Sequence, residues 1–204
     1  MGYYDEISEL GQEAMKEIGS IGTGNASTAL SKLLNIKVEM ALPEVKMLKL
    51  QEVVSYVGNA EEEVSAVLSE LSKDISGVML FILDLEFINT LTESMFQKTY
   101  TAYEELDEMA CSVITEVGNI VNSAYVTALS QMTEFDIHLS VPSLTMNMLG
   151  GILNIPLTVV GNETNHLMLV TGKFMIGETH HEASLFLVPD EASLMKVLKK
   201  VGVL

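Results

Sequence analysis

Two stretches of the chain carry apolar residues at steps of three and four, and this spacing predicts two long helices. Between 105 and 131 the apolar positions are Ala110, Val113, Ile114, Val117, Ile120, Val121 and Ala124. Near the N-terminus, ISELGQEAMKEIG (7–19) and the residues after it have the same spacing at Ile7, Leu10, Ala14, Ile18 and Ile21. Such a stripe is typical of a helix that packs one face against a core.

Other stretches show the shorter period of strands. KVEMALP (37–43) and FDIHLSV (135–141) alternate apolar and polar residues, which predicts extended chain with one buried face. The apolar stretches VMLFIL and SLFLVP are each followed by an aspartate and an amphipathic helical pattern. EEEVSAVLSEL (61–71) stays open between two interpretations. Its composition favours a helix, while the alternation of its apolar residues favours a strand in a hairpin with 76–83.

The sequence contains an internal repeat. EIGSIGTGNASTALS (17–31) and EVGNIVNSAYVTALS (116–130) share seven of fifteen residues, and Pro43 precedes Pro142 by the same offset of 99 positions. We therefore expect one domain, 1–204, made of two halves at about 1–100 and 101–204. The predicted fold is α/β of the α+β kind. Each half has a leading helix, antiparallel strands and a second helix, and the halves pack as one pseudo-two-fold body.

The glycines of EIGSIGTGNAST (17–28) raise the question of a phosphate-binding loop. Such a loop needs a strand before it and a helix after it, whereas a helical pattern precedes these glycines. The second copy also has Val121 in place of Gly22, and valine adopts loop conformations poorly. We favour close helix packing for Gly22, Gly24 and Ala26, with the two repeat helices as the packing partners.

The composition excludes several classes of function. The formal charge is −17, with 28 acidic residues, 11 lysines and no arginine. Such a surface repels nucleic acid and anionic lipid, and it lacks the side chain that usually grips phosphate. Cys111 is the only cysteine, which excludes an internal disulfide, and the longest clean apolar run is too short to cross a bilayer. We expect a cytoplasmic protein without membrane insertion.

The two copies share a polar helix face. At spacings of four and three residues it carries Ser112, Glu116 and Asn119 in the second copy and Glu13, Glu17 and Ser20 in the first. These positions share one side of a helix, away from the apolar stripe, so they should be accessible to solvent. Such a face is commonly only a hydrated surface. Because the glutamate is retained while its neighbours differ, a functional interpretation becomes more plausible.

The spacing Ser112, x3, Glu116, x2, Asn119, x22, Pro142 resembles the signature of the CheC/CheX/FliY phosphatases of chemotaxis. EIGSIGTGNA also resembles the opening helix of this family, and two copies in one chain resemble the CheC type. The resemblance implies hydrolysis of the aspartyl phosphate on the response regulator CheY. It implies catalytic roles for Glu116 and Asn119, with Ser112 capping or positioning the helix face. Pro142 would be architectural, since proline fixes a turn and offers no donor.

The resemblance also implies the cofactor and the partners. Mg²⁺ would belong to the receiver domain of CheY, and this chain would need no cofactor of its own. Asn119 would orient the attacking water, and Glu116 would contact the receiver's active-site lysine. The deamidase CheD is a second candidate partner, and duplication within one chain makes a monomer the expected state.

The first copy departs from the family pattern. Glu17 is retained, but Ser20 stands at the asparagine position and Glu13 at the leading position, with Pro43 as the matching proline. A serine is shorter than an asparagine and has no amide, so we expect the Glu17/Ser20 site to be weak or to bind without turnover. A second function therefore stays open, that of a weakly catalytic adaptor for a receiver or for CheD.

Other candidate chemistry is poorly supported. The spacings of His138, His166, His180 and His181 match no set of metal ligands, so we expect no metal site. Cys111 adjoins the apolar stripe and has no indicated histidine partner, so packing is favoured over a nucleophilic role.

Overall fold

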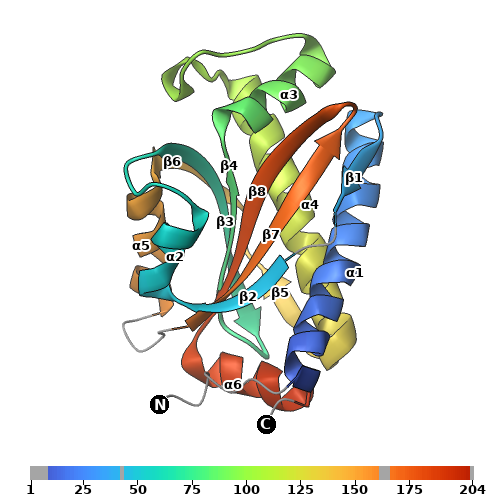
Figure 1. The fold of residues 1–204 in the computed structure, drawn as a ribbon, viewed down its shortest axis with the longest axis vertical. Helices are drawn as coiled ribbons and strands as arrows, with labels where there is room; N and C mark the ends of the chain where they lie inside the picture. Colours follow the sequence, from blue (N-terminus) through green and yellow to red (C-terminus); the bar gives the residue numbers. More distant parts are fainter. Residues whose placement is uncertain (1–8, 42–43, 161–165, 203–204) are drawn as a thin grey trace.

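The order of helices and strands runs twice along the chain (Figure 1). The computed structural model describes residues 9–41, 44–160 and 166–202. The first series is α1 (Glu9–Leu34), β1 (Val38–Met40), β2 (Glu44–Lys49), α2 (Leu50–Val57), β3 (Glu63–Lys73), β4 (Gly77–Leu83) and α3 (Leu85–Phe96). After the short 3-10 helix η1 (Tyr103–Glu105), the second series is α4 (Glu108–Thr133), β5 (Ile137–Leu139), β6 (Ser143–Met148), α5 (Leu149–Val160), β7 (His166–Ile176), β8 (Thr179–Pro189) and α6 (Glu191–Lys200).

The strands of the described residues form one antiparallel sheet in which the two halves exchange strands. The order is β1-β7-β8-β4-β3-β5, with β2 also paired to β7 and β6 also paired to β3. Strands β1 and β2 therefore pair with a strand of the second half, and β5 and β6 pair with a strand of the first. The predicted class of mixed helices and antiparallel strands is confirmed.

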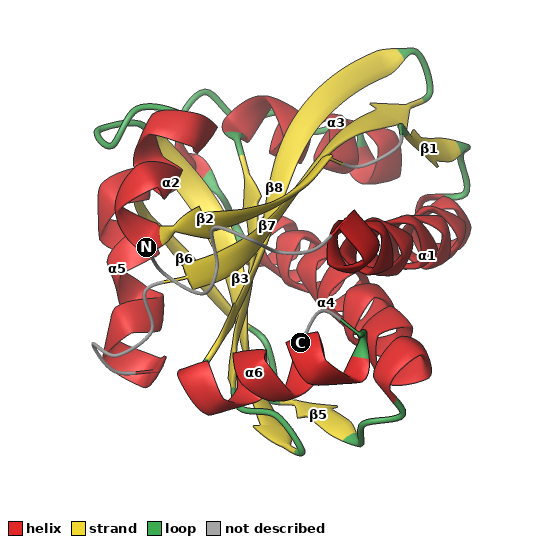
Figure 2. Ribbon diagram, turned by 60° about the horizontal axis from the view of Figure 1, so that its bottom comes forward, coloured by secondary structure: helices red, strands yellow, loops and turns green. Residues whose placement is uncertain are grey.

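The helices cover both faces of the sheet (Figure 2). Helices α1 and α4 lie side by side on one face, where their apolar stripes join α3, α6 and the sheet in a single core. Helices α2 and α5 lie on the other face, over a smaller core around Val53, Leu80, Ile152 and Phe186. Ile18 of the first predicted stripe and most of the second stripe thus lie in this core, while Ile7 lies outside the described residues. The polar faces of α1 and α4 point away from the sheet.

A close approach between α1 and α4 joins the two repeats. A Cβ atom placed on Gly22 would lie only 2.7 Å from Tyr125 Cδ1, so no larger residue fits there without a shift. The Thr23 hydroxyl lies 2.7 Å from the Tyr125 hydroxyl in a buried hydrogen bond. Packing between the repeat helices is confirmed at Gly22, and Ala26 is fully buried. The prediction for Gly24 is wrong, because Gly24 is exposed and no atom lies within 4 Å of a Cβ placed on it.

The second predicted helix of each half begins as expected. The aspartates after the apolar strands are N-caps: Asp84 accepts a hydrogen bond from Phe87 N at 2.7 Å, and Asp190 accepts one from Ser193 N at 2.7 Å. The ambiguous stretch 61–71 lies largely in strand β3, which forms a hairpin with β4. Each half also contains a third helix, α2 or α5, that the prediction of two helices per half omitted.

Candidate functional site

Helix α4 has a firmly defined beginning. Asp107 is its N-cap and accepts a hydrogen bond from Ala110 N at 2.9 Å, while Lys98 Nζ lies 2.6 Å from the other carboxylate oxygen. The hydrogen bond from Lys98, followed by that from the Ala110 amide, lowers the pKa of Asp107 to about 2. Because Asp107 is the cap and Ser112 lies inside the helix, the capping role considered for Ser112 is wrong.

The polar face of α4 is accessible, as predicted from the spacing. Ser112 and Glu116 are exposed and Asn119 is partly exposed, while the stripe of the same helix lies in the core at Ala110, Val113, Ile114, Val117, Val121 and Ala124. Glu116 and Asn119 are three residues apart on a helix, which places their Cβ atoms about 5–6 Å from each other. The two side chains can therefore reach one bound group together.

Glu116 and Asn119 are also free to bind. Within the described part of the chain, neither side chain makes a hydrogen bond or an ion pair. A carboxylate that accepts hydrogen bonds thus stands beside an amide that both donates and accepts them. Such a pair can bind a cation and hold one water molecule in a fixed orientation.

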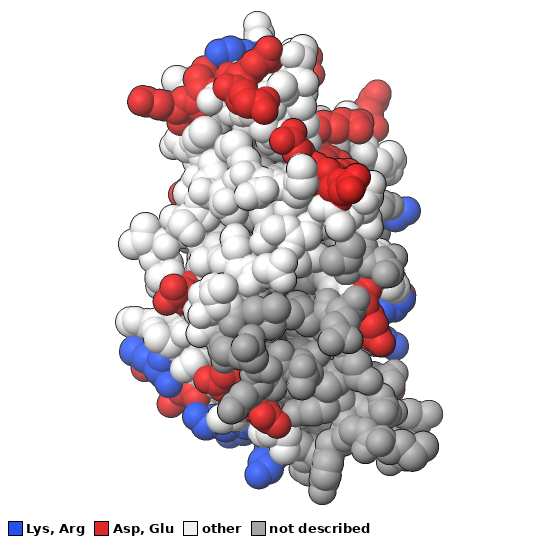
Figure 3. All heavy atoms as spheres, turned by 90° about the vertical axis from the view of Figure 1, so that its left-hand side faces the viewer, with Lys and Arg blue, Asp and Glu red and all other residues white. Residues whose placement is uncertain are grey.

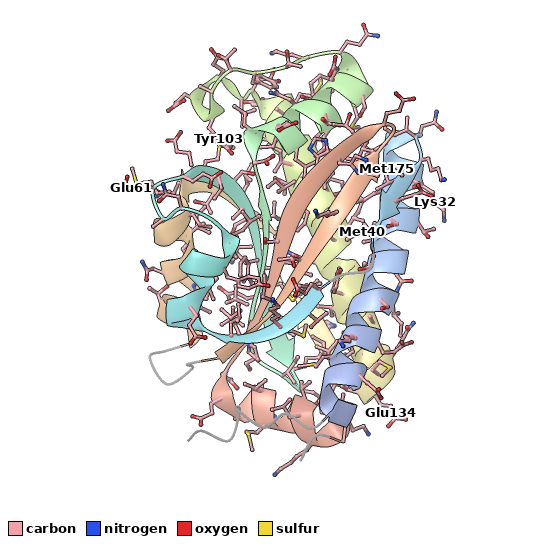
Figure 4. All side chains as sticks on the ribbon, viewed as in Figure 1. Lys32, Met40, Glu61, Tyr103, Glu134 and Met175 are labelled. Atoms are coloured by element: carbon pink, nitrogen blue, oxygen red, sulfur yellow. The ribbon has the colours of Figure 1, made fainter. Side chains whose placement is uncertain are left out.

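The equivalent face of α1 is accessible as well. Glu13 and Glu17 are exposed and Ser20 is partly exposed. The colours of Figure 1 show that α1 and α4 run in opposite directions, and Figure 4 marks Lys32 near the end of α1 and Glu134 directly after α4 at opposite ends of the pair. The two polar faces are therefore displaced from each other along the helix pair. The structure does not bring the two sets of residues into one site.

The prolines of the motif lie outside the helices. Pro142 is partly buried in the connection between β5 and β6, two short strands that both pair with β3. This position suits an architectural residue. Pro43 lies outside the described residues.

Acidic side chains gather at the end of the molecule that carries α3 and η1, near the beginning of α4 (Figure 3). Glu104, Glu105 and Glu108 are exposed there. A broad band without charged side chains lies below them in the same view. Among the described residues, no cluster of positively charged side chains is seen at this end in the same view.

The cysteine and the histidines considered as candidates lie in surroundings that favour a structural role. Burial raises the pKa of the partly buried Cys111 thiol, which disfavours the reactive thiolate. His181 is buried and stacks on Phe87 with ring centroids 4.9 Å apart, while His138 and His180 are exposed. In the described part of the chain, no three His, Cys, Asp or Glu side chains are grouped to hold a metal ion. No helix there has the length and apolar character required to cross a bilayer.

Two residues on the inner side of α4 were missed by the sequence analysis. Gly118 lies against Val67 of β3, and Asn122 is completely buried within a largely apolar surface. A signal for the second was present, because an asparagine directly follows Val121 in the apolar stripe. Both residues contact the sheet directly behind the polar face of α4.

The leading helix of each half, together with the strands directly after it, is the part of the chain that matches a known family model. The model of the CheC-like family matches residues 10–47 and 109–151, which include nearly all of α1 and of α4. The resemblance to the CheC/CheX/FliY family expected from the sequence is confirmed.

Individual relatives extend the match over the whole chain. The chain is 28% identical to the CheY-P phosphatase CheC of Bacillus subtilis over 99% of both sequences. The crystal structure of Thermotoga maritima FliY has a TM-score of 0.75 and 21% identity, covering 96% of this chain and 98% of that one. The CheX–CheY–BeF3–Mg²⁺ complex of Borrelia burgdorferi matches with a TM-score of 0.53 and 20% identity, covering 84% of this chain and 97% of that one. The two structures establish a shared fold.

Proposed function

We propose that this protein is a protein aspartyl-phosphate phosphatase that hydrolyses the phosphoryl group of phosphorylated CheY. The observation that carries the proposal is the free pair Glu116 and Asn119 on the accessible face of α4, at the spacing of the family signature. The full-length similarity to a CheY-P phosphatase supports the same substrate. Termination of a chemotaxis signal is the role that follows.

Water is the nucleophile of the proposed reaction. Asn119 enters the receiver's active site, and its amide oxygen accepts a hydrogen bond from the water while its NH₂ group donates one. The water oxygen bonds to phosphorus as the bond between phosphorus and the aspartyl oxygen breaks. Inorganic phosphate leaves and the aspartate carboxylate of the receiver is regenerated. The contribution of Asn119 is placement of the water in line with the leaving group.

Charge neutralisation belongs to the partner in this proposal. The receiver supplies Mg²⁺ and its lysine, and Glu116 binds that lysine and holds the two proteins in register. This division agrees with a chain that has 28 acidic residues and no arginine. Phosphoryl transfer needs positioned groups and electrostatic stabilisation, and both can come from the two sides of an interface.

The first repeat contributes little to turnover in this account. Glu17 can bind a receiver's lysine, but the Ser20 hydroxyl is shorter than the Asn119 amide. A water displaced by about 1 Å lowers the rate by on the order of 100-fold. The Glu17/Ser20 face is thus a weak site or one that binds without turnover.

The test is the loss of phosphate from phosphorylated CheY with and without this protein. We expect accelerated loss, which Asn119→Ala abolishes and the matched variant Ser20→Ala leaves nearly unchanged. A protein that binds CheY or CheD tightly and leaves the phosphate lifetime unchanged would instead be an adaptor. If Ser20→Ala is the damaging variant, the assignment of the two sites is reversed.

A further inference from the structure

The amide of Asn122 is buried behind the proposed site with incomplete hydrogen bonding. Its side chain is fully buried, and its NH₂ group lies 3.4 Å from both the Val67 carbonyl oxygen and the Ser69 hydroxyl. Both distances are long for hydrogen bonds. The Asn122 Oδ1 atom has no partner among the described residues. Such a group costs stability, so its presence calls for a reason other than packing.

Helix α4 rests on the Val67 side chain of β3 at the same place. A Cβ atom on Gly118 would lie 2.3 Å from Val67 Cβ, so the helix backbone lies directly against the Val67 side chain. Gly118 and Asn122 are four residues apart and therefore on one side of the helix. Contact at these two points fixes both the height of α4 above the sheet and its rotation. The same contact therefore orients Asn119, which lies between the two positions in the sequence, and Glu116, which lies two residues before Gly118.

The two repeats differ at this contact. The strand pairings make β7 the counterpart of β3, since Val67 pairs with Leu144 as Val170 pairs with Val45. Thr23 of α1 stands at the position of Asn122, and Gly172 of β7 stands at the position of Ser69. Thr23 turns instead to Tyr125, with its hydroxyl 2.7 Å from the phenol oxygen. The polar contact with a strand is thus made by α4, the helix that carries Asn119, and Thr23 of α1, the helix that carries Ser20, bonds to Tyr125 instead.

We propose that Asn122, held by Val67 and Ser69 of β3, is a positioning residue that sets the rotation of α4 and thereby aims the Asn119 amide at the attacking water. The proposal rests on the proposed function. It explains why a buried amide with an unpaired oxygen stands one turn from the functional asparagine. A helix that slid or rotated on an apolar contact would displace that asparagine relative to the receiver.

Asn122→Leu separates positioning from packing. Leucine keeps the branched side-chain skeleton and removes both polar atoms, so the melting temperature should stay equal or rise. If Asn122 positions Asn119, kcat for phosphorylated CheY falls roughly 10- to 100-fold. KM and the affinity for CheY loaded with BeF3 and Mg²⁺ change less than kcat, because the long Glu116 side chain keeps its charge and can still reach the receiver's lysine, whereas the position of the water tolerates little displacement. A purely structural residue would leave kcat unchanged or lower it together with the melting temperature, and either result overturns the proposal.

Two further variants keep the test decisive. Thr23→Val removes the equivalent buried hydroxyl of the first repeat, and it should lower the melting temperature while kcat stays within twofold. Ser69→Ala loosens the Asn122 contact from the strand side and should lower kcat even if Asn122→Leu does not fold. A fully active Ser69→Ala protein overturns the inference. A wild-type protein without phosphatase activity would contradict the proposed function, which is a different outcome from an active Asn122→Leu variant.

Discussion

At the scale of single residues, Asn119 and Ser20 occupy equivalent positions on helices of opposite direction. The difference between an amide and a hydroxyl is the reason for assigning turnover to one of them. An amide presents a donor and an acceptor on separate atoms beyond two side-chain torsions, and it can hold a water molecule from both sides. A serine hydroxyl does not reach as far from the helix. The proposed inequality of the two sites follows from this difference in reach and bonding.

Restoring the amide in the first repeat should restore the chemistry. In an Asn119→Ala background, Ser20→Asn should raise the rate of CheY-P dephosphorylation by roughly 10- to 100-fold over the parent, because Glu17 already occupies the adjacent position. Steady-state phosphate release measures the change. Ser20→Gln in the same background is the matched control, since its longer side chain carries the amide to a different place. Equal rates for the two variants would show that placement of the amide is not what limits the reaction.

Asp107 gives a prediction about pH. Its pKa is about 2 in the folded chain and 3.8 in its ordinary state. A lowered pKa contributes stability that is present above pH 4 and is lost as the pH falls toward 2. The melting temperature of Asp107→Asn should therefore lie below that of the wild type at neutral pH, and the difference should shrink as the pH falls through this range. A difference that stays constant down to pH 2 would mean that charge and the bond to Lys98 contribute nothing.

At the scale of elements, the helix pair α1 and α4 determines where the candidate residues lie. Their apolar stripes were predictable from spacing, and the predicted helix at 105–131 is α4 at Glu108–Thr133. The exposure of Glu116 followed from the same periodicity. The contact of Asn122 with β3 did not, because no local pattern tells which strand lies beneath a helix.

Two glycines of α1 form a matched pair for testing the helix contact. Gly22→Ala should lower the free energy of unfolding by about 1–3 kcal/mol, because the new methyl group meets the Tyr125 ring. Gly24→Ala should raise it by about 0.5–1 kcal/mol, because that position is open and alanine favours helix. Urea unfolding measures both. The same sign for the two substitutions would contradict the packing described for α1 and α4.

Helices α2 and α5 were not predicted from the sequence, for identifiable reasons. Helix α2 has only eight residues, too few for a clear period, and its bounds adjoin those of β2. Helix α5 contains Pro156 and two adjacent glycines near its start, which are signals for a break in a helix. Both helices are held by burial against the second face of the sheet. Tertiary packing, which the sequence pattern does not report, outweighs local propensity in each of them.

At the scale of the whole molecule, the exchange of strands makes each half dependent on the other. The internal repeat predicted two similar halves in one body, but it could not predict that β1 and β2 would pair with β7 and that β5 and β6 would pair with β3. This pairing needs contacts between residues far apart in the sequence, from 64 positions for Lys73 and Ile137 to 138 positions for Val38 and Ile176. It also places α1 beside α4, and so it sets the relation between the two candidate sites.

The exchanged sheet predicts that neither half folds alone. Fragments 1–100 and 101–204 expressed separately should lack a cooperative thermal transition, because each leaves the edges of its long strands unpaired. Mixing the fragments should restore the transition and the phosphatase activity. Circular dichroism melting and the phosphate-release assay follow the two properties. A cooperative transition in either isolated fragment would show that the exchanged strands are dispensable.

The most direct test of the central claim separates binding from turnover at Asn119. The dissociation constant for CheY loaded with BeF3 and Mg²⁺ and the rate of phosphate release from phosphorylated CheY are measured for the wild type and for Asn119→Ala. For Asn119→Ala we expect a dissociation constant within about threefold of the wild type and a rate indistinguishable from that of phosphorylated CheY alone. Retained hydrolysis by Asn119→Ala would contradict the account, because the water would then be oriented by another group.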